Sequence, residues 1–215
     1  MNRRRHVKAV IFDFDLTLID SFDIFKKVRI DLDKKHNLKF QGISEEQAWG
    51  SSVAGNARLM VQNNPDTTLS WQEVEKLTIE YMTKHFADVE IIAQNFITSL
   101  RQNGKILGIV TGNNTGVIQN VLENGHNDRL EFDFVCHSDT EQTKEQLLFD
   151  CIEKYNVLKD EIIYVGDHAN DIKAAKKAGI LSAAVATGLQ SKEFLAALKP
   201  DLIVDNLDEL EKYLI

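Results

Sequence analysis

Four aspartates, Asp13, Asp15, Asp167 and Asp171, follow two short apolar segments of the sequence. In an extended chain alternate side chains point to the same side, so Asp13 and Asp15 are expected to face one site. Two like charges so close require a partner. A hard cation such as Mg²⁺ binds one or two carboxylates together with the phosphate oxygens of a substrate, whereas the cysteines and histidines show no zinc-like spacing. The aspartates therefore predict a magnesium site, with Asp13 and Asp167 as ligands.

Neutral and basic residues that suit an anionic substrate follow the other apolar segments. Thr111, Gly112 and Asn113 come after the segment 105–110 and offer a hydroxyl and backbone N–H groups to phosphoryl oxygens. Lys144 begins a helical stretch and can balance phosphate charge as a point charge. Together with an acidic nucleophile and a metal-binding aspartate, these groups are typical of phosphoryl transfer, and a carboxylate nucleophile would pass through an aspartyl phosphate.

Short apolar strands alternate with helical stretches along much of the chain. Strands are expected over residues 7–12, 105–110, 132–136, 161–165, 181–185 and 201–204. Helices are expected over 91–102, 116–123, 145–155, 170–178, 192–198 and 207–214. From residue 91 onward this alternation predicts an α/β fold with a doubly wound parallel sheet, in which ligands bind at the carboxyl ends of the strands.

Residues 18–90 interrupt this alternation with a helical insert. They contain no convincing strand, and helices are expected over 22–36, 45–49, 55–62 and 71–86. Ser44 with Gln47 and Ser70 with Glu73 have the spacing of capping boxes at two of the helix starts. We therefore expect a core domain formed by residues 1–17 and 91–215, and a helical cap domain formed by residues 18–90.

Composition and charge exclude several kinds of partner. The 215 residues include 25 Lys and Arg against 33 Asp and Glu, and a net charge of -8 disfavours nucleic acid as a ligand. No stretch approaches the ~18 apolar residues of a membrane-spanning helix. Cys136 and Cys151 lie in apolar stretches, where two buried free thiols are expected. The sequence thus predicts a cytoplasmic protein with no nucleic-acid or membrane partner, and it does not indicate the oligomeric state.

Taken together, these motifs resemble those of the haloacid dehalogenase superfamily. The similarity covers nearly the whole core and points to the phosphatase branch with a type-1 helical cap, which includes phosphoglycolate phosphatases and β-phosphoglucomutases. DFDLT at residues 13–17 matches the first motif of the family, and Thr111 after its apolar strand matches the second. Lys144 matches the third motif, and GDHAND, with Asp167 and Asp171, matches the fourth. The order and spacing of all four motifs make the resemblance specific.

The resemblance implies a role for each acidic residue. Asp13 is then the nucleophile and a metal ligand, and Asp15 is the general acid and base whose backbone carbonyl also contacts Mg²⁺. Asp167 is a further metal ligand, and Asp171 orders Lys144 or the waters on the metal. The cofactor implied is Mg²⁺, and the substrate implied is a small phosphorylated metabolite.

The resemblance also implies groups that bind the phosphoryl moiety. Thr111 and the amides of Gly112 and Asn113 would hold it, and Lys144 would bridge it to the nucleophile. Thr17, at the end of the first motif, and Arg58, in the helical insert, are further candidates for substrate binding.

Two residues depart from the pattern of the family. Leu16 stands where relatives usually have glycine, and Glu145 follows the lysine where many relatives have proline. Neither departure removes a reacting group.

Other reactions use the same groups. A phosphomutase would return the phosphoryl group to a sugar phosphate, and a phospho-receiver module would hold an aspartyl phosphate without turnover. The size of the chain and its helical insert argue against the receiver. Dehalogenation needs no acid at Asp15, and the dehalogenases that the chain resembles lack one. The sequence leaves the leaving group open among phosphoglycolate, sugar phosphates, nucleotides and pyrophosphate.

Overall fold

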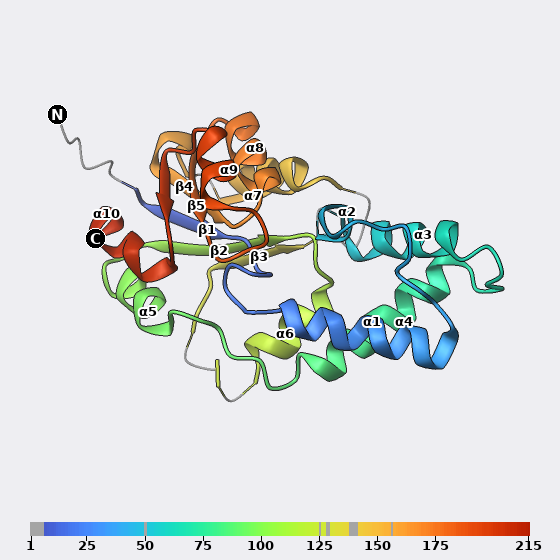
Figure 1. The fold of residues 1–215 in the computed structure, drawn as a ribbon. Coiled ribbons are helices and arrows are strands. Elements are labelled where there is room, and N and C mark those ends of the chain that lie inside the picture. The colour runs from blue at the N-terminus through green and yellow to red at the C-terminus, as the bar shows by residue number, and fades with distance from the viewer. Residues whose placement is uncertain (1–6, 50, 125, 128–129, 138–141, 156) are drawn as a thin grey trace.

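A parallel sheet of six strands forms the centre of the computed structural model, which describes residues 7–49, 51–124, 126–127, 130–137, 142–155 and 157–215. Its strand order is β3-β2-β1-β4-β5-β6 (Figure 1). Each predicted strand is confirmed to within two residues at either end. The strands are β1 (Ala9–Phe12), β2 (Ile106–Thr111), β3 (Phe134–His137), β4 (Ile162–Gly166), β5 (Leu181–Val185) and β6 (Leu202–Val204).

Strand β1 lies in the middle of the sheet because it pairs with β2 on one side and β4 on the other. Its four residues are fully buried, and they alternate between two hydrophobic clusters. Val10 and Phe12 pack with the side chains of α5 (Gln94–Gln102) and α6 (Thr115–Leu122), whereas Ala9 and Ile11 pack with those of α7 (Lys144–Tyr155) and α8 (Ala169–Ala178). This two-sided burial is why the strand is a continuous apolar run, and it confirms the predicted doubly wound fold.

Helices cover both faces of the sheet, close to where they are expected. The predicted helix over 207–214 begins instead as a 3₁₀ turn at Leu207–Leu210, which is common at helix starts. A further 3₁₀ turn covers Lys159–Glu161. The helices are α5 (Gln94–Gln102), α6 (Thr115–Leu122), α7 (Lys144–Tyr155), α8 (Ala169–Ala178), α9 (Lys192–Ala197) and α10 (Glu211–Leu214).

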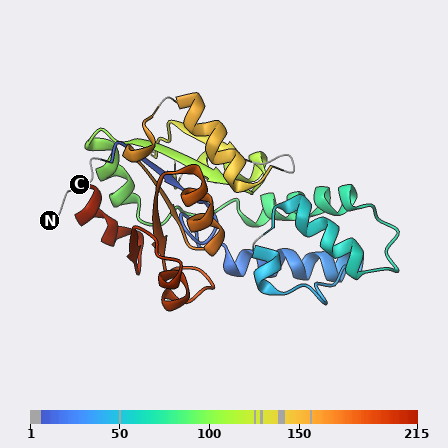
Figure 2. The ribbon, with the colours of Figure 1, turned by 90° about the horizontal axis from the view of Figure 1, so that it is seen from above.

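Four helices between β1 and α5 lie together at one end of the molecule, far from α10 (Figures 1 and 2). Their starts follow from the sequence: Ser70 and Glu73 form a reciprocal capping box at α4, and Ser44 and Gln47 exchange the same pair of hydrogen bonds at α2. The regular elements described within residues 18–90 are thus all helices, as predicted. The helices are α1 (Phe22–His36), α2 (Glu45–Trp49), α3 (Val53–Asn63) and α4 (Trp71–His85).

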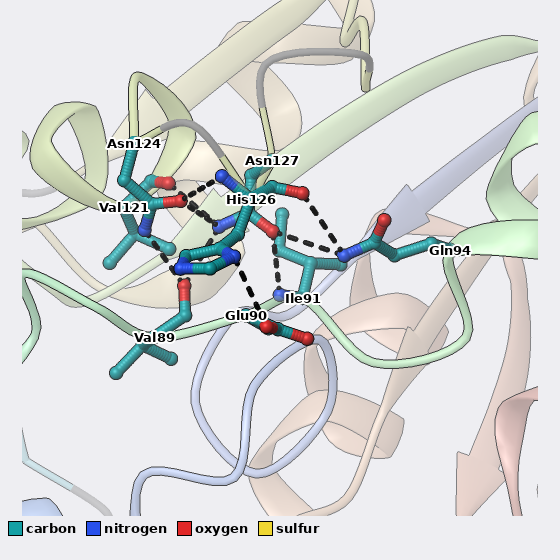
Figure 3. A network of polar contacts seen from close by, with 8 residues as sticks. All are labelled: Val89, Glu90, Ile91, Gln94, Val121, Asn124, His126 and Asn127. Carbon is teal, nitrogen blue, oxygen red and sulfur yellow. Dashed lines mark hydrogen bonds and ion pairs between the residues drawn. The ribbon is translucent and has the colours of Figure 1, made fainter.

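Two chain segments join these helices to the rest of the molecule, residues 13–21 before α1 and residues 86–93 after α4, and they contact each other. The amide of Ile92 donates to the carbonyl of Leu18 at 2.7 Å. The Asn127 side chain, which is completely buried, fixes the second segment (Figure 3). Its Oδ1 accepts from the amide of Ile91 at 2.8 Å, and its Nδ2 donates to the carbonyl of Val89 at 2.8 Å. The second connection is thus held by hydrogen bonds as well as by packing.

Replacing Asn127 with alanine is expected to lower the free energy of unfolding by about 3 kcal/mol, because the buried amide of Ile91 loses its acceptor and the carbonyls of Val89 and Val121 each lose a donor. Chemical denaturation monitored by circular dichroism measures the change. A matched control is His126→Ala, because the His126–Glu90 pair is exposed and its loss is expected to cost less than about 1 kcal/mol. Equal effects of the two substitutions would contradict this role of Asn127.

The two cysteines are paired. Cys136 of β3 and Cys151 of α7 form a disulfide across a Cα–Cα distance of 6.7 Å, so the prediction of two free thiols is wrong for this structure. Both residues sit in apolar stretches, as expected, but α7 packs on β3 and brings the two stretches together. The predicted cytoplasmic location therefore loses the support that two free thiols would have given it. In the described part of the chain, none of the helices has the length and apolar character needed to span a membrane.

Candidate active site

A cavity of about 450 Å³ lies where the carboxyl ends of β1, β2 and β4 meet the helices of residues 18–90. Because parallel strands end at the same edge of a sheet, residues far apart in the sequence meet here. The sheet contributes Asp13, Asp15, Thr111 and Asp167 to the wall, and the first residue of α7 contributes Lys144. The predicted convergence of these groups is therefore observed.

Lys144 links two of the acids. Its Nζ lies 3.0 Å from Asp13 Oδ1 and 2.6 Å from Asp171 Oδ1. Asp171 also accepts, through Oδ2, the amide of His168 at the start of α8, so its carboxylate is held on both sides. Asp171 and Asp13 thus both contact the Lys144 ammonium.

Asp167 is held in place by two neighbours. Thr17 Oγ1 donates to Asp167 Oδ1 at 3.2 Å, and Thr17 is completely buried. On another side, the backbone of Gly188 is so close that a β-carbon there would overlap the Asp167 carboxylate. The predicted role of Thr17 in substrate binding is thus replaced by a structural one, because its hydroxyl is used by Asp167 and it is not part of the cavity wall.

Asp15 occupies a tight turn after β1. Leu16, at the position where the family pattern has glycine, has φ 57°, a left-handed conformation that favours glycine. The Leu16 carbonyl accepts from Thr187 Oγ1 at 2.6 Å, which helps to hold the turn. Asn113 Nδ2 donates to Asp15 Oδ2 at 2.9 Å, while Asp15 Oδ1 is buried without a hydrogen-bond partner in the described residues. One oxygen of Asp15 is therefore anchored and the other remains available.

Burial raises the pKa values of the acids. It raises the pKa of Asp13 to about 7; the Lys144 ammonium opposes this rise, and the charges of Asp171 and Asp15 add to it. It raises the pKa of Asp15 to about 6. Burial and the charges of Asp171 and Asp13 raise the pKa of Asp167 well above its ordinary value. Although burial acts in the opposite direction, the carboxylates of Asp13 and Asp171 raise the pKa of Lys144.

The carboxylates of Asp13, Asp167 and Asp171 form the cluster best suited to a metal ion. One oxygen from each lies within 4.8 Å of the others, and all three residues are buried. Oxygen ligands of this kind fit a hard cation such as Mg²⁺, and a bound cation would oppose the burial and the mutual repulsion that raise the pKa values of Asp13 and Asp167. Both oxygens of Asp171 already accept hydrogen bonds, from Lys144 and from the amide of His168, whereas Lys144 contacts one oxygen of Asp13, which leaves Asp13 and Asp167 as the better placed pair. The side chain of Asp15 lies outside this cluster.

The loop after β2 serves the site differently from the expectation. Thr111, Gly112 and Asn113 line the cavity, as predicted. However, the amide of Asn113 donates to Thr111 Oγ1 at 3.1 Å instead of pointing freely at a ligand. Within the described structure, the visible contribution of Asn113 is the hydrogen bond from its side chain to Asp15.

Arg58 is not brought to the cavity. Its guanidinium lies 4.1 Å from the centre of the Trp71 ring, and it is absent from the cavity wall. Helix α3 instead turns Ala57 and Met60 into the core. The residues that do line the cavity from this end were not predicted, and they include Phe25, Arg29, Phe40, Trp49 and Met82.

The chain belongs to the haloacid dehalogenase-like hydrolase family, whose model matches residues 10–185. It is 26% identical over 219 residues to the N-acetylmuramic acid 6-phosphate phosphatase of Pseudomonas aeruginosa, covering 97% of this chain and 95% of that protein. It is also 26% identical over 246 residues to the phosphoglycolate phosphatase of Salmonella typhi, covering 98% of this chain and 93% of that protein.

Solved structures share the fold. The crystal structure of CbbY from Rhodobacter sphaeroides in complex with phosphate matches with a TM-score of 0.81 over 95% of this chain and 96% of that chain. At 14% sequence identity, this likeness concerns the fold alone. It agrees with the doubly wound sheet and the inserted helices described above.

Proposed function

We propose that the protein is a Mg²⁺-dependent phosphatase that hydrolyses a small phosphorylated metabolite through an aspartyl phosphate on Asp13. The observation that carries the proposal is the position of Lys144, whose Nζ lies 3.0 Å from Asp13 and 2.6 Å from Asp171, two members of the buried cluster that also contains Asp167. Similarity to phosphatases over nearly the whole chain supports the same reaction class.

In the first half of the reaction, a carboxylate oxygen of Asp13 attacks phosphorus and the bond from phosphorus to the leaving oxygen breaks. Asp15 donates its proton to that oxygen, so the product leaves as an alcohol. A pKa of about 6 allows Asp15 to carry this proton in a fraction of molecules near neutral pH, while Asn113 fixes its orientation.

In the second half, water attacks the phosphorus of the aspartyl phosphate. The Asp15 carboxylate accepts a proton from this water, the bond between phosphorus and Asp13 breaks, and inorganic phosphate is formed. Lys144 and the loop at Thr111 bind the phosphoryl oxygens throughout. When bound by Asp13 and Asp167, with the backbone carbonyl of Asp15, Mg²⁺ supplies positive charge beside the transferring group.

The proposal assigns different tasks to the two parts of the chain. Residues 1–17 and 91–215 form a core domain that carries out the chemistry, and residues 18–90 form a cap domain that recognises the leaving group and excludes water. Support comes from the cavity, whose wall is formed by both parts. The proposal places the enzyme in the cytoplasm, with a small metabolite as its partner.

Turnover of a phosphomonoester in water labelled with ¹⁸O tests the reaction. Hydrolysis by this route is expected to release one alcohol for each inorganic phosphate, with the label in the phosphate because water attacks phosphorus. A phosphomutase would instead yield an isomerised sugar phosphate without free phosphate. A stable aspartyl phosphate without turnover would identify a receiver module and contradict the proposal.

Substituting valine for Thr17 is expected to weaken activation by Mg²⁺, because the isosteric side chain cannot donate to Asp167. A loss of an oriented carboxylate partner of this kind typically costs about 10-fold to 100-fold in metal affinity. The Mg²⁺ concentration for half-maximal phosphate release is the readout. Thr17→Ser keeps the hydroxyl and is the control; it is expected to retain activation, and equal effects of both variants would refute the role of the hydrogen bond.

A further inference from the structure

The outer end of the cavity has a wall that the chemistry does not use. Residues 18–90 supply apolar and aromatic side chains there, notably Phe25, Phe40, Trp49 and Met82. At about 450 Å³, the cavity is of the size typical of sites for whole small molecules, roughly 300–1,000 Å³. A phosphoryl group with a two-carbon leaving group would leave much of this space, and most of the apolar wall, in contact with water.

Trp49 is held in a fixed orientation at this wall. Its ring packs edge to face with Phe25, at 4.8 Å between ring centres, and stacks with Phe22 at 6.1 Å. Its indole N–H donates to Glu45 Oε2 at 3.0 Å. A ring fixed in this way offers a flat contact surface with little loss of conformational entropy on binding.

The positive charge at this wall is already neutralised. In the described part of residues 18–90, Arg29 is the one charged side chain that lines the cavity. Its Nη1 lies 2.8 Å from Glu45 Oε1, and its guanidinium lies 4.6 Å from the centre of the Phe40 ring. The other cation at the rim, Lys173 of α8, is exposed, so solvent screens its charge. Among the described residues, a second anionic group on the substrate would therefore meet an arginine already paired with Glu45 and a rim lysine whose charge is screened by solvent.

We infer that the leaving group is an uncharged alcohol that carries a ring, such as a sugar or a nucleoside, which packs against Trp49 and Phe25. This inference rests on the proposed phosphatase function and deepens it. Small substrates with a second negative charge, such as phosphoglycolate and pyrophosphate, fit the wall poorly, because its aromatic and apolar part gives them no charged partner and its arginine is bound to Glu45, although Ser51, Ser52, Asn56 and Thr78 add polar groups to the same cavity.

A substrate panel tests the inference with size, ring and charge varied separately. The panel contains hexose 6-phosphates, amino-sugar 6-phosphates, nucleoside 5′-monophosphates, glycerol 3-phosphate, phosphoglycolate and pyrophosphate, each with Mg²⁺. We expect kcat/KM for at least one ring-bearing class to exceed that for the acyclic and doubly anionic compounds by about 10-fold or more. The sugar and nucleoside arms show which ring is preferred.

Two tryptophan variants provide the matched pair, because the chain contains two tryptophans and only Trp49 lines the cavity. Trp49→Ala is expected to lower the ratio of kcat/KM for the best ring substrate to that for glycerol 3-phosphate by about 10-fold. Trp71→Ala, whose ring contacts Arg58 outside the cavity, is expected to leave this ratio unchanged. Trp49→Phe keeps a ring at the wall and serves if the alanine variant does not fold.

The outcomes separate this inference from the proposed function. Phosphate release that is fastest for phosphoglycolate or pyrophosphate, or a ratio that Trp49→Ala does not change, overturns the substrate class alone. Absence of phosphate release from every compound, above the background of an Asp13→Asn variant, overturns the phosphatase function and the substrate class together.

Discussion

Replacing Asp13 with asparagine is expected to abolish phosphate release and, at the same time, to stabilise the metal-free protein at about pH 8. The amide cannot attack phosphorus, so the aspartyl phosphate does not form. Removal of a nucleophile that forms a covalent intermediate lowers kcat by roughly 10⁴-fold or more in well studied hydrolases. The same substitution removes a buried negative charge from a cluster of carboxylates.

The stability gain follows from the sign of the pKa change. Asp13 titrates near 3.8 when unfolded and near 7 when folded, so between these values the folded state binds more protons than the unfolded state. The free energy of unfolding therefore falls as the pH rises through this window, and the full cost is present above about pH 7. This change in pKa corresponds to about 4 kcal/mol, which is the upper limit of the gain, and we expect about 1–3 kcal/mol.

Urea denaturation of the two proteins in EDTA, at about pH 4 and at about pH 8, measures this gain. The variant is expected to be more stable at the higher pH and close to the parent at the lower one, because at about pH 4 Asp13 is protonated in the folded state and only partly ionised in the unfolded state, so most of the cost has not yet appeared. Asp66→Asn is the control, because Asp66 is exposed and its replacement is expected to change little. Retained turnover, or a loss of stability at the higher pH, would contradict the assignment of Asp13.

The inner part of the site could be predicted because topology determines it. Apolar runs mark the strands of a parallel sheet, and residues such as Asp13, Thr111 and Asp167 follow directly after three of them. Once β1 is known to lie between β2 and β4, these residues must meet at one edge. Lys144 was a candidate from its place at a helix start, but its role beside the nucleophile came from the family resemblance, because a lysine at a helix start is common and its direction is not encoded in the spacing.

The outer part of the site could not be predicted, because it depends on how helices pack. Arg58 was a reasonable candidate by residue type, yet α3 directs it to Trp71 and away from the cavity. Phe25 and Arg29 lie four residues apart and so share one face of α1, but the sequence does not say which side of the molecule that face meets. The contact between Cys136 and Cys151 likewise depends on the packing of a helix on a sheet.

Replacing Lys144 with methionine is expected to abolish activity as well, but with the opposite effect on stability. The ammonium lies within 3.0 Å of both Asp13 and Asp171, whereas the described cluster of Asp13, Asp167 and Asp171 consists of carboxylates alone. Removing one partner of a buried ion pair leaves the other charges uncompensated, which typically costs about 3–5 kcal/mol. Because the Lys144 side chain is 22% exposed, we expect about 2–4 kcal/mol at about pH 8.

The pH dependence and a second substitution show whether charge is the cause. Without the ammonium, the pKa values of the carboxylates rise further. The stability lost in the Lys144→Met variant is therefore expected to become smaller as the pH falls toward 4 and the carboxylates become protonated. Adding Asp13→Asn to Lys144→Met should recover part of the lost stability, because one of the unpaired charges is then gone. Lys192→Met removes an exposed ion pair of the same 2.6 Å length, with Asp205, and is expected to cost less than about 1 kcal/mol. A deficit that is equal at both pH values, with no recovery in the double variant, would mean that Lys144 stabilises the fold by packing, and its place beside the nucleophile would then need another explanation.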